Sequence, residues 1–488
     1  MRERSARSAR PLVEDDPRAP SRIAESALAP EGRAAGPAGL RGWLADLRHR
    51  VYTHVRHVPL DSLEDWSGEP GTGNIRHRSG RFFTLEGLEA HIPGGPVASW
   101  SQPIIDQPEI GILGILAKEF DGVLHFLMQA KAEPGNCNGL QLCPTVQATR
   151  SNYSGVHRGR AVPYIEYFRD PPPRSVIADV RQSEQGSWFY RKRNRNMVVE
   201  VAGDVEALDG FRWLTLGQLH RLLAEDDLVN ADARTVLSCL PFAGPDLAQV
   251  YPEGTAFQSA LVRSFTLGER GAHSLDEVLS WMTAVRARTD VHTRKIALSD
   301  VRRWLRTEDT IVHETGRFFS VIGVDVAAGG REVGRWSQPM IQPHGTGVVA
   351  FLVRPIGGVL HALVHARVEP GYVDVLELAP TVQCTPANYE VLPAGARPRH
   401  LDLVLDAAPE RVRFEATLSE EGGRFYHARN RYMIVEVGDL DPADLEHPDY
   451  RWLTLGQLVE LLRHSHYVNI QARSLVACLH SLSTDDAR

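Results

Sequence analysis

Val123-Leu-His-Phe-Leu-Met-Gln-Ala-Lys-Ala-Glu133, followed by Pro134-Gly135, has an apolar residue at every even position. Four odd positions carry the polar side chains His125, Gln129, Lys131 and Glu133. A helix would spread these polar groups around its axis, whereas the two-residue period of a β-strand places them on one face. The pattern predicts a strand whose apolar face packs in a core and whose polar face forms the floor of a binding or catalytic pocket.

The same pattern returns later as Val359-Leu-His-Ala-Leu-Val-His-Ala-Arg-Val-Glu369, again followed by Pro-Gly. Residues 100–153 and 336–389 agree at 25 of 54 positions without gaps, and residues 212–219 are repeated letter for letter at 451–458. A repeat of this length is too long for a solenoid unit. The sequence therefore predicts a tandem duplication of a whole domain, with a pocket floor in each copy.

The domain boundaries follow from length and local composition. The chain of 488 residues is too long for one ordinary core, so two domains are expected. Residues 1–38 are rich in Arg, Ala, Pro and Gly without apolar periodicity, which predicts a disordered tail. A first module is expected over residues 39–245, a linker over 246–268 and a second module over 269–488. Each copy reads as a helix, several strands and then helices, which is an α+β fold.

Helix starts are marked by capping motifs. A helix is expected near residues 40–55, and Ser274-Leu-Asp-Glu277 is a capping box that opens its counterpart. The repeated Thr-Leu-Gly-Gln motif predicts another helix start in each copy. The residues assigned to capping, rather than to chemistry, are Ser274, Thr215, Thr454, Asn230 and Asn469.

Overall composition excludes several classes of protein. A net charge of -7 is not that of a general nucleic-acid binder, which usually has a strongly basic domain. Five cysteines without a Cys-x-x-Cys pair favour reduced thiols over a disulfide framework or a Cys-rich zinc site. No apolar run approaches the roughly 20 residues of a membrane span, and no apolar segment follows the Arg-rich start. We therefore expect a cytoplasmic protein.

A second polar strand face is predicted over residues 140–149. Gln141, Thr145, Gln147 and Thr149 alternate there, as do Glu377, Thr381, Gln383 and Thr385 in the second copy. Pro144 cannot donate a ladder hydrogen bond, which indicates an edge strand or a bulge. Amide and hydroxyl groups on one face suit the hydroxyl groups of a sugar; the alternative is an exposed polar sheet face.

The chain resembles the NDP-hexose 2,3-dehydratase family. The resemblance covers nearly the whole chain after residue 38, and its motifs are Trp100-Ser-Gln-Pro-Ile-Ile-Asp-Gln107, Gly111-Ile-Leu-Gly114, residues 124–136 and residues 144–153. It implies a dTDP-4-keto-6-deoxy-glucose substrate, two Nudix-like modules per subunit, a homodimer, and a role in making 2-deoxysugars for natural products such as antibiotics. Neither half has the Glu-rich helix that holds Mg²⁺ in a Nudix hydrolase, so hydrolysis is not expected.

The implied reaction is an elimination of water. The C4 keto group acidifies the C3 proton, which a base removes, and an acid protonates the leaving C2 hydroxyl. The resulting enol tautomerises to a 3,4-diketo sugar, which a downstream 3-ketoreductase is expected to consume. Because no hydride moves, we expect no nicotinamide or other cofactor and no metal, in keeping with the lack of a convincing Gly-x-Gly-x-x-Gly after a strand.

Lys131 and Glu133, together with His125, are the predicted acid and base. Their spacing separates the Cα atoms of Lys131 and Glu133 by about 6.6 to 6.8 Å, which suits neighbouring carbons of one ring. Which group is the base stays open. The alternatives are an ion pair on a solvated face for Lys131 and Glu133, and a structural or metal-binding role for His125.

The nucleotide is expected to contact the same module. Trp100 is predicted to stack on thymine, although a core position suits it equally, and Arg150, Arg193 and Arg195 are predicted to bind diphosphate oxygens. The other predicted substrate contacts are Gln102, Gln129, Asn136, Thr145, Gln147, Tyr153 and Asn194.

The two copies differ where chemistry would respond. Lys131 is replaced by Arg367, which cannot readily release a proton. We therefore expect the first module to be catalytic and the second to bind a similar ligand or to serve structure. The second predicted site consists of Trp336, Gln338, His361, Arg367, Glu369, Thr381, Gln383 and Arg429. For the whole chain, the alternative is a non-catalytic nucleotide-sugar-binding protein.

Overall fold

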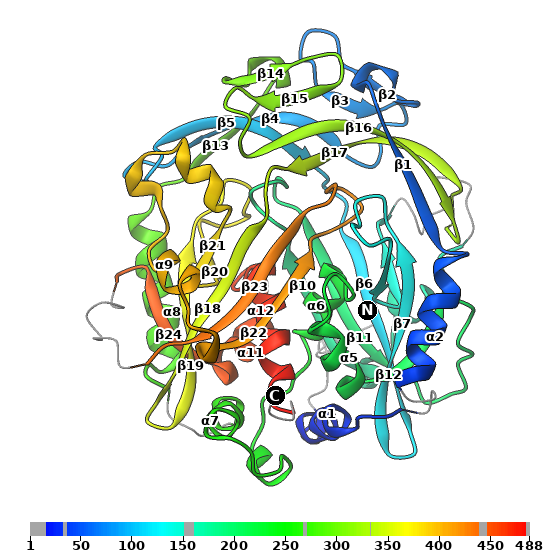
Figure 1. Cartoon of the computed structure of the whole chain (residues 1–488), viewed down its shortest axis with the longest axis vertical. Helices are drawn as coiled ribbons and strands as arrows, with labels where there is room; N and C mark the ends of the chain where they lie inside the picture. Colours follow the sequence, from blue (N-terminus) through cyan, green and yellow to red (C-terminus); the bar gives the residue numbers. More distant parts are fainter. Residues whose placement is uncertain are drawn as a thin grey trace, which may run out of the picture.

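Two inner sheets stand side by side beneath two outer sheets in the computed structural model, which describes residues 16–32, 37–150, 161–266, 271–331, 333–438 and 447–484. Figure 1 shows the inner sheet of the first half on the right, that of the second half on the left, and the outer sheets across the top. Helices α6 (Ala231–Leu237) and α12 (Ile470–Ser481) pack together between the inner sheets. The α+β fold class is confirmed.

The two inner sheets have matching topologies. In each, one parallel pair, β11 with β6 and β23 with β18, is flanked by antiparallel strands. The first contains β10 (Val176–Ser183), β11 (Arg193–Glu200), β6 (Gly111–Phe120), β7 (Val123–Ala132), β12 (Phe211–Thr215), β8 (Leu140–Cys143) and β9 (Val146–Ala148). The second contains β22 (Val412–Ser419), β23 (Arg429–Glu436), β18 (Gly347–Ile356), β19 (Val359–Arg367), β24 (Tyr450–Thr454), β20 (Glu377–Ala379) and β21 (Val382–Cys384).

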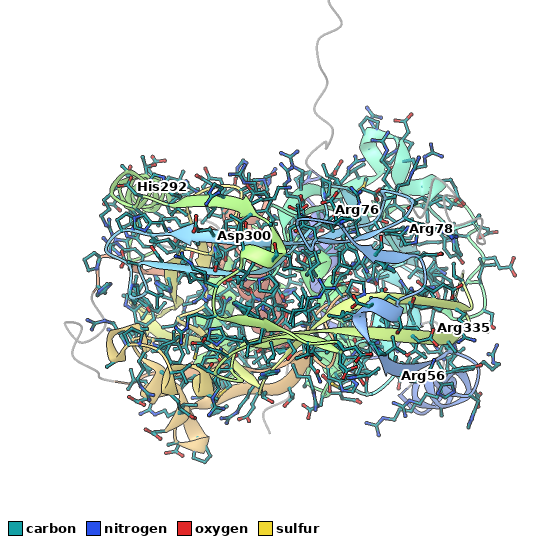
Figure 2. All side chains as sticks on the ribbon, turned by 90° about the horizontal axis from the view of Figure 1, so that it is seen from above. Arg56, Arg76, Arg78, His292, Asp300 and Arg335 are labelled. Atoms are coloured by element: carbon teal, nitrogen blue, oxygen red, sulfur yellow. The ribbon has the colours of Figure 1, made fainter. Side chains whose placement is uncertain are left out.

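The two outer sheets exchange a strand. One contains β2 (Trp66–Gly68), β3 (Ile75–His77), β4 (Thr84–His91), β5 (Ser99–Asp106) and, from the second half, β13 (His292–Ile296). The other contains β14 (Trp304–Arg306), β15 (Thr310–His313), β16 (Phe319–Gly329), β17 (Arg335–Pro343) and, from the first half, β1 (Tyr52–Val58). Seen from above in Figure 2, Arg56 of β1 and His292 of β13 lie at opposite ends of this layer. Each half of the chain therefore completes a sheet of the other.

Ten α-helices occur in the described ranges, and the capping predictions are confirmed. Capping boxes at Thr215, Thr454 and Ser274 open α5, α11 and α8, while the Asn230 and Asn469 side chains cap α6 and α12. The other bounds are α1 (Ala19–Leu28), α2 (Pro37–Arg48), α4 (Glu166–Arg169), α5 (Leu216–Leu223), α7 (Ala256–Phe265), α8 (Leu275–Arg288), α9 (Leu401–Leu405) and α11 (Leu455–Leu462). The helix predicted near residues 40–55 ends earlier, because β1 begins at Tyr52.

The predicted tail and linker are wrong in part, because each contains a helix of the fold. Helix α1 lies within residues 1–38 and buries Ile23 completely, and α7 lies within 246–268 and buries Phe265 completely. The two helices are counterparts. Ser26 Oγ donates to the carbonyl oxygen of Leu124, and Ser264 Oγ donates to that of Leu360. The duplicated unit thus begins with a short helix that the composition of these segments conceals.

Strand β7 confirms the alternation that predicted it. Leu124, Phe126 and Met128 enter a core shared by both halves, while Leu127 on the other face packs in a cluster with Phe168. Both faces are covered, so the polar side chains are not solvated. The predicted strand over residues 140–149 is broken at Pro144, where it leaves β7 and pairs with β6.

Buried arginines join the halves across their common core. Arg234 of α6 donates to the carbonyl oxygen of Ser419 at 2.7 Å, and Arg473 of α12 donates to that of Ser183 at 2.6 Å. Both side chains are fully buried.

Within the described part of the chain, no helix combines the length and apolar character that crossing a membrane requires.

Candidate active site

A cavity of about 770 Å³ lies at the end of β7, where the first inner sheet meets both outer sheets. Its walls come from both halves of the chain, because β17 and the loop between β22 and β23 reach over the first module. Charged and amide residues that line it are Glu64, Asp65, Arg78, Gln107, Lys131, Glu133, Gln147, Glu184, Lys192, Asn194, Asp232, Arg331, Arg335, Gln338, Glu421 and Arg424.

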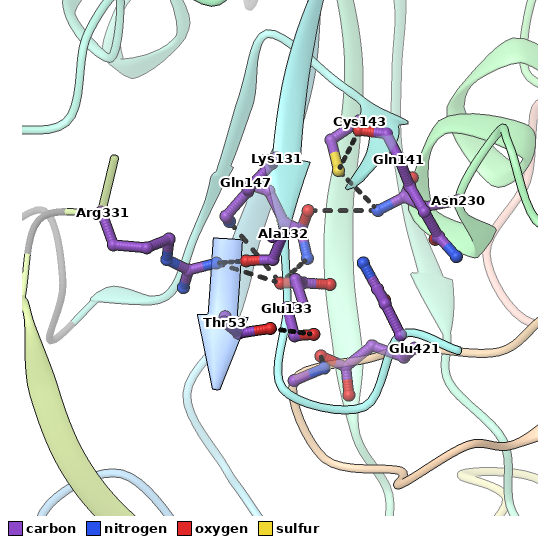
Figure 3. Close-up of polar contacts among 12 residues, drawn as sticks. Thr53, Lys131, Ala132, Glu133, Gln141, Cys143, Gln147, Asn230, Arg331 and Glu421 are labelled. Carbon is purple, nitrogen blue, oxygen red and sulfur yellow. Dashed lines mark hydrogen bonds and ion pairs between the residues drawn. The ribbon is translucent and has the colours of Figure 1, made fainter. Parts of the chain in front are cut away.

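Lys131 and Glu133 lie together in this cavity (Figure 3). Lys131 Nζ is 3.6 Å from Glu133 Oε1, and both side chains are almost fully buried. Gln147 Nε2 donates to the same carboxylate oxygen at 3.1 Å, and Arg331 Nη1 lies 3.8 Å from it. Arg331 also donates to the carbonyl oxygen of Ala132 at 3.0 Å. The predicted pair is therefore buried and held by neighbouring side chains, and it is not an ion pair on a solvated face.

Of the further carboxyl groups that line the cavity, those of Glu184, Asp232 and Glu421 form what we call the carboxyl cluster. Burial raises the pKa of Glu421 to about 7; Arg424 opposes this rise, and Glu133 and Glu184 add to it. Burial, followed by the charges of Glu184 and Glu421, raises the pKa of Asp232 well above its ordinary value. Burial also raises the pKa of Glu184. Burial and mutual repulsion thus both favour the protonated forms of these carboxyl groups.

Cationic groups complete the walls. Burial lowers the pKa of Lys192 to about 8, and its ammonium donates to the carbonyl oxygen of Glu109 at 2.5 Å. The Arg331 guanidinium carbon lies 5.8 Å from the ring centroid of Trp336. Arg78 and Arg335, from different halves, lie near the same end of the outer layer in Figure 2 and line the cavity. The site can thus bind an anion and an aromatic ring next to its acid and base groups.

Because the outer sheets exchange strands, the tryptophan that lines the cavity of the first module comes from the second half of the chain. Trp100 and Gln102 were expected beside Lys131, yet the cavity is lined by Trp336 and Gln338, which were expected in the second site. Both pairs have the same local geometry, with the indole N–H donating to the glutamine Oε1 at 2.8 and 2.9 Å. The motif of the second half, rather than that of the first, therefore lines the cavity at Lys131.

Four predicted residues of the first site line the cavity, namely Lys131, Glu133, Gln147 and Asn194. His125 does not, because it lies at the far end of β7, where it is hydrogen-bonded to the carbonyl oxygen of Val123 and packs against Phe120. Thr145 is structural, since its hydroxyl bridges Leu127 and Leu116 of the backbone. Tyr153 lies outside the described residues.

The remaining first-site predictions also lie away from the cavity lining. Arg195 is paired with Asp179 at 2.6 Å, Asn136 donates to the carbonyl oxygen of Gly139, and Gln129 sits in mid-strand between β12 and β8. Arg150 is exposed, and Arg193 is half-buried at the start of β11. Their expected substrate contacts would require a bound ligand that extends past the cavity.

The corresponding residues of the second module are bonded to one another and to the backbone. Arg367 Nε donates to Glu369 Oε1 at 2.8 Å, Gln383 donates to the same oxygen, and the buried Tyr372 occupies the position of Asn136. His361 accepts from the backbone N–H of Ala272, and Thr381 bonds the backbone as Thr145 does. Arg429 pairs with Asp227 at 2.5 Å.

The carboxyl cluster and the cations beside it were not predicted from the sequence. A comparison of the two copies could have found most of them, because their charge differs between the copies. In the repeated Ser-Glu segments, Glu421 corresponds to Gln185 and Lys192 to Ala428; after the aligned asparagine caps, Asp232 corresponds to Gln471. These are changes of charge at otherwise matching positions, like the change from Lys131 to Arg367. Arg331 has no such signal, because it precedes the aligned block.

Comparison with known proteins supports the duplication and shows the family. The family model described as NDP-hexose 2,3-dehydratase matches the chain twice, at residues 38–240 and 275–479. A dTDP-4-dehydro-6-deoxy-alpha-D-glucopyranose 2,3-dehydratase of Saccharopolyspora spinosa is 51% identical over 484 residues, with 98% of both chains covered. Proteins of the same description from Amycolatopsis orientalis and Streptomyces violaceoruber are 50% and 48% identical over 466 and 456 residues, covering 94% and 92% of this chain and 93% and 98% of theirs. With both halves matched by the family model and relatives about half identical over nearly the whole chain, the chain belongs to the NDP-hexose 2,3-dehydratase family.

Proposed function

We propose that this protein removes water across C2 and C3 of dTDP-4-keto-6-deoxy-glucose to give a 2,6-dideoxy-3,4-diketo sugar nucleotide in deoxysugar biosynthesis. The observation that carries this proposal is the buried pair Lys131 and Glu133 in a cavity with carboxyl groups and arginines, in a chain about half identical to named dehydratases. Elimination needs one group that accepts a proton and another that donates one, and each is worth about 10²- to 10⁴-fold in rate.

Glu133 is the base in this proposal. Its carboxylate is oriented by Gln147 and flanked by Lys131 and Arg331, so it is held in one position at the cavity wall. Lys131 stabilises the negative charge that develops on the C4 oxygen when C3 loses its proton. This division of roles is our proposal for the choice between the two groups, which the spacing alone leaves open.

The nucleotide lies against the second half of the chain. Trp336 offers a ring face for the thymine, and Arg331 and Arg335 from the same segment are placed for diphosphate oxygens. The first site is thus built from both modules, with the sugar next to β7 and the nucleotide next to β17.

The second site serves structure in this proposal. Arg367 is held by Glu369 and the carbonyl oxygen of Gln383, and Tyr372 occupies space beside them. The modules are Nudix-like scaffolds without hydrolytic chemistry, and the protein acts as a cytoplasmic homodimer whose product passes to a 3-ketoreductase. Light scattering in solution tests the dimer.

The decisive test is incubation with dTDP-4-keto-6-deoxy-glucose without added cofactor or metal. A 3-ketoreductase and NADPH trap the unstable product, and mass spectrometry follows the loss of water. Formation of a 2,6-dideoxy-4-keto sugar nucleotide is expected. Binding without turnover would instead identify a nucleotide-sugar-binding protein, and Mg²⁺-dependent release of a nucleoside monophosphate would identify a Nudix hydrolase.

A further inference from the structure

The carboxyl cluster is more than a lining of the cavity, because its members are buried without their full set of hydrogen bonds. Asp232 and Glu184 are 3% and 5% exposed. Asp232 Oδ1, Glu184 Oε2 and Glu421 Oε2 each have no hydrogen-bond partner among the described residues. A buried carboxyl oxygen without a partner carries a desolvation penalty, so its retention calls for a function.

The three buried carboxyl groups cannot all be ionised at once, because their negative charges would repel one another without solvent to screen them. Glu184 and Glu421 come from opposite halves and face the same cavity, and each raises the pKa of Asp232. Carboxyl groups that interact this strongly share protons and titrate as a unit. The groups that act on Asp232 from the surrounding elements are Glu184, Glu421, Glu133, Lys131 and, on β8, Cys143.

The second half provides an internal comparison. There Glu420 corresponds to Glu184, and it is hydrogen-bonded by Asn430, Tyr432 and Gln185. Gln185 occupies the place of Glu421, and Gln471 that of Asp232. The second site therefore has one carboxylate, Glu420, and two neutral side chains at these three positions, whereas the first has a carboxyl group at each. The second site keeps a different buried acid, Glu377, which accepts from Ser183 and whose pKa burial raises to about 7.

We propose that Asp232 is the general acid of the dehydration, donating the proton that turns the departing C2 hydroxyl into water. Glu421, supplied by the other half of the chain, is a positioning residue that keeps Asp232 protonated. The inference rests on the proposed function and adds a residue to it. Glu133 takes the C3 proton, and the electrons of that C–H bond form an enolate whose charge lies on the C4 oxygen. The enolate electrons then return to form the C2–C3 double bond, and the C2–O bond breaks as Asp232 delivers its proton. Asp232 is left as a carboxylate and regains a proton while the enol tautomerises.

The test separates proton removal from loss of water. Wild-type protein and the Asp232→Asn variant are incubated with substrate in D₂O, and mass spectrometry with NMR follows both deuterium at C3 and dehydration. Without the acid, the enolate formed by Glu133 returns to substrate and takes up deuterium. We expect Asp232→Asn to keep C3 exchange while dehydration falls by about 10²-fold or more.

The matched control is Gln471→Asn, which places the same residue at the corresponding position of α12 and shortens the side chain there by one methylene group. It is expected to leave both rates unchanged. Joint loss of exchange and dehydration in folded Asp232→Asn, equal loss in Gln471→Asn, or full dehydration by Asp232→Asn would each overturn the proposal. Wild-type turnover is measured first, so failure of the proposed function is recognised separately.

A second variant decides the matter if Asp232→Asn does not fold. Glu421→Gln installs the residue that the second half already has at this position and removes one negative charge near Asp232. The acid must be protonated to work, so the rate falls as pH rises through its pKa. Losing the neighbouring charge lowers that pKa, and the alkaline limb of the kcat profile should move to lower pH by about one unit. An unmoved limb would contradict the role of Glu421.

Discussion

At the scale of single residues, the sequence predicted which side chains of β7 lie together, because a two-residue period fixes which side chains share a face. Lys131 and Glu133 followed from that rule, and so did their counterparts Arg367 and Glu369. The rule does not say which strand of the other sheets packs against that face. For this reason Trp100 was expected at the cavity that Trp336 lines. Asp232 was missed for a different reason. It lies two residues after the cap of α6, where a polar residue is common and gives no sign of a functional role.

The exchange of Lys131 for Arg367 gives a residue-scale prediction. Lys131→Ala should lower kcat by about 10²- to 10⁴-fold with little loss of stability, because Gln147 and Arg331 still hold Glu133. Arg367→Ala should keep kcat but lower the free energy of unfolding by about 3 to 5 kcal/mol, since it leaves the buried Glu369 without its ion-pair partner. Steady-state kinetics and urea unfolding measure both. Equal loss of kcat in the two variants would reverse the assignment of the catalytic module.

At the scale of elements, capping motifs located helix starts well because the cap is made by adjacent residues. Thr215 with Gln218 and Ser274 with Glu277 need no tertiary partner. Helices α1 and α7 were missed because they are short and rely on the shared core for stability, with Ile23 and Phe265 fully buried. Strand exchange was equally hidden, since β1 and β13 come from corresponding positions and either could complete either sheet.

Strand exchange predicts an element-scale effect at Gly87 of β4. A Cβ added there would lie 2.8 Å from the carbonyl oxygen of Ala297, just after the exchanged β13, and 2.6 Å from Val301. Gly87→Ala should therefore lower the free energy of unfolding by about 1 to 3 kcal/mol through overpacking. Gly42→Ala in α2 is the control with the same added methyl group. It meets nothing within 4 Å and should stabilise by about 0.5 to 1 kcal/mol. Urea unfolding midpoints that move together in both variants would argue against the close crossing.

At the scale of the whole molecule, a repeat predicts two copies of a fold but not how they are joined. The copies share one core, exchange strands and build one open cavity from both halves. The interface between the two halves also buries a pair of histidine side chains. His220 of α5 and His480 of α12 meet edge to face with centroids 4.9 Å apart, and His480 stacks on Phe242 at 4.0 Å.

This interface should make the molecule sensitive to acid. Burial lowers the pKa of His220 to about 3, whereas an unfolded chain holds histidine near 6.5. Between these values the unfolded state binds a proton that the folded state rejects. The stabilisation is thus complete above about pH 6.5 and is lost as pH falls, by up to about 1.4 kcal/mol per pH unit for this one group. His220→Val places at this position the residue found at its counterpart, Val459, and removes the titrating group. Urea unfolding from pH 8 to 4 should show a shallower acid loss in the variant, with the difference at pH 8 reporting packing alone. Parallel curves would mean that the two halves do not bury His220 at their interface.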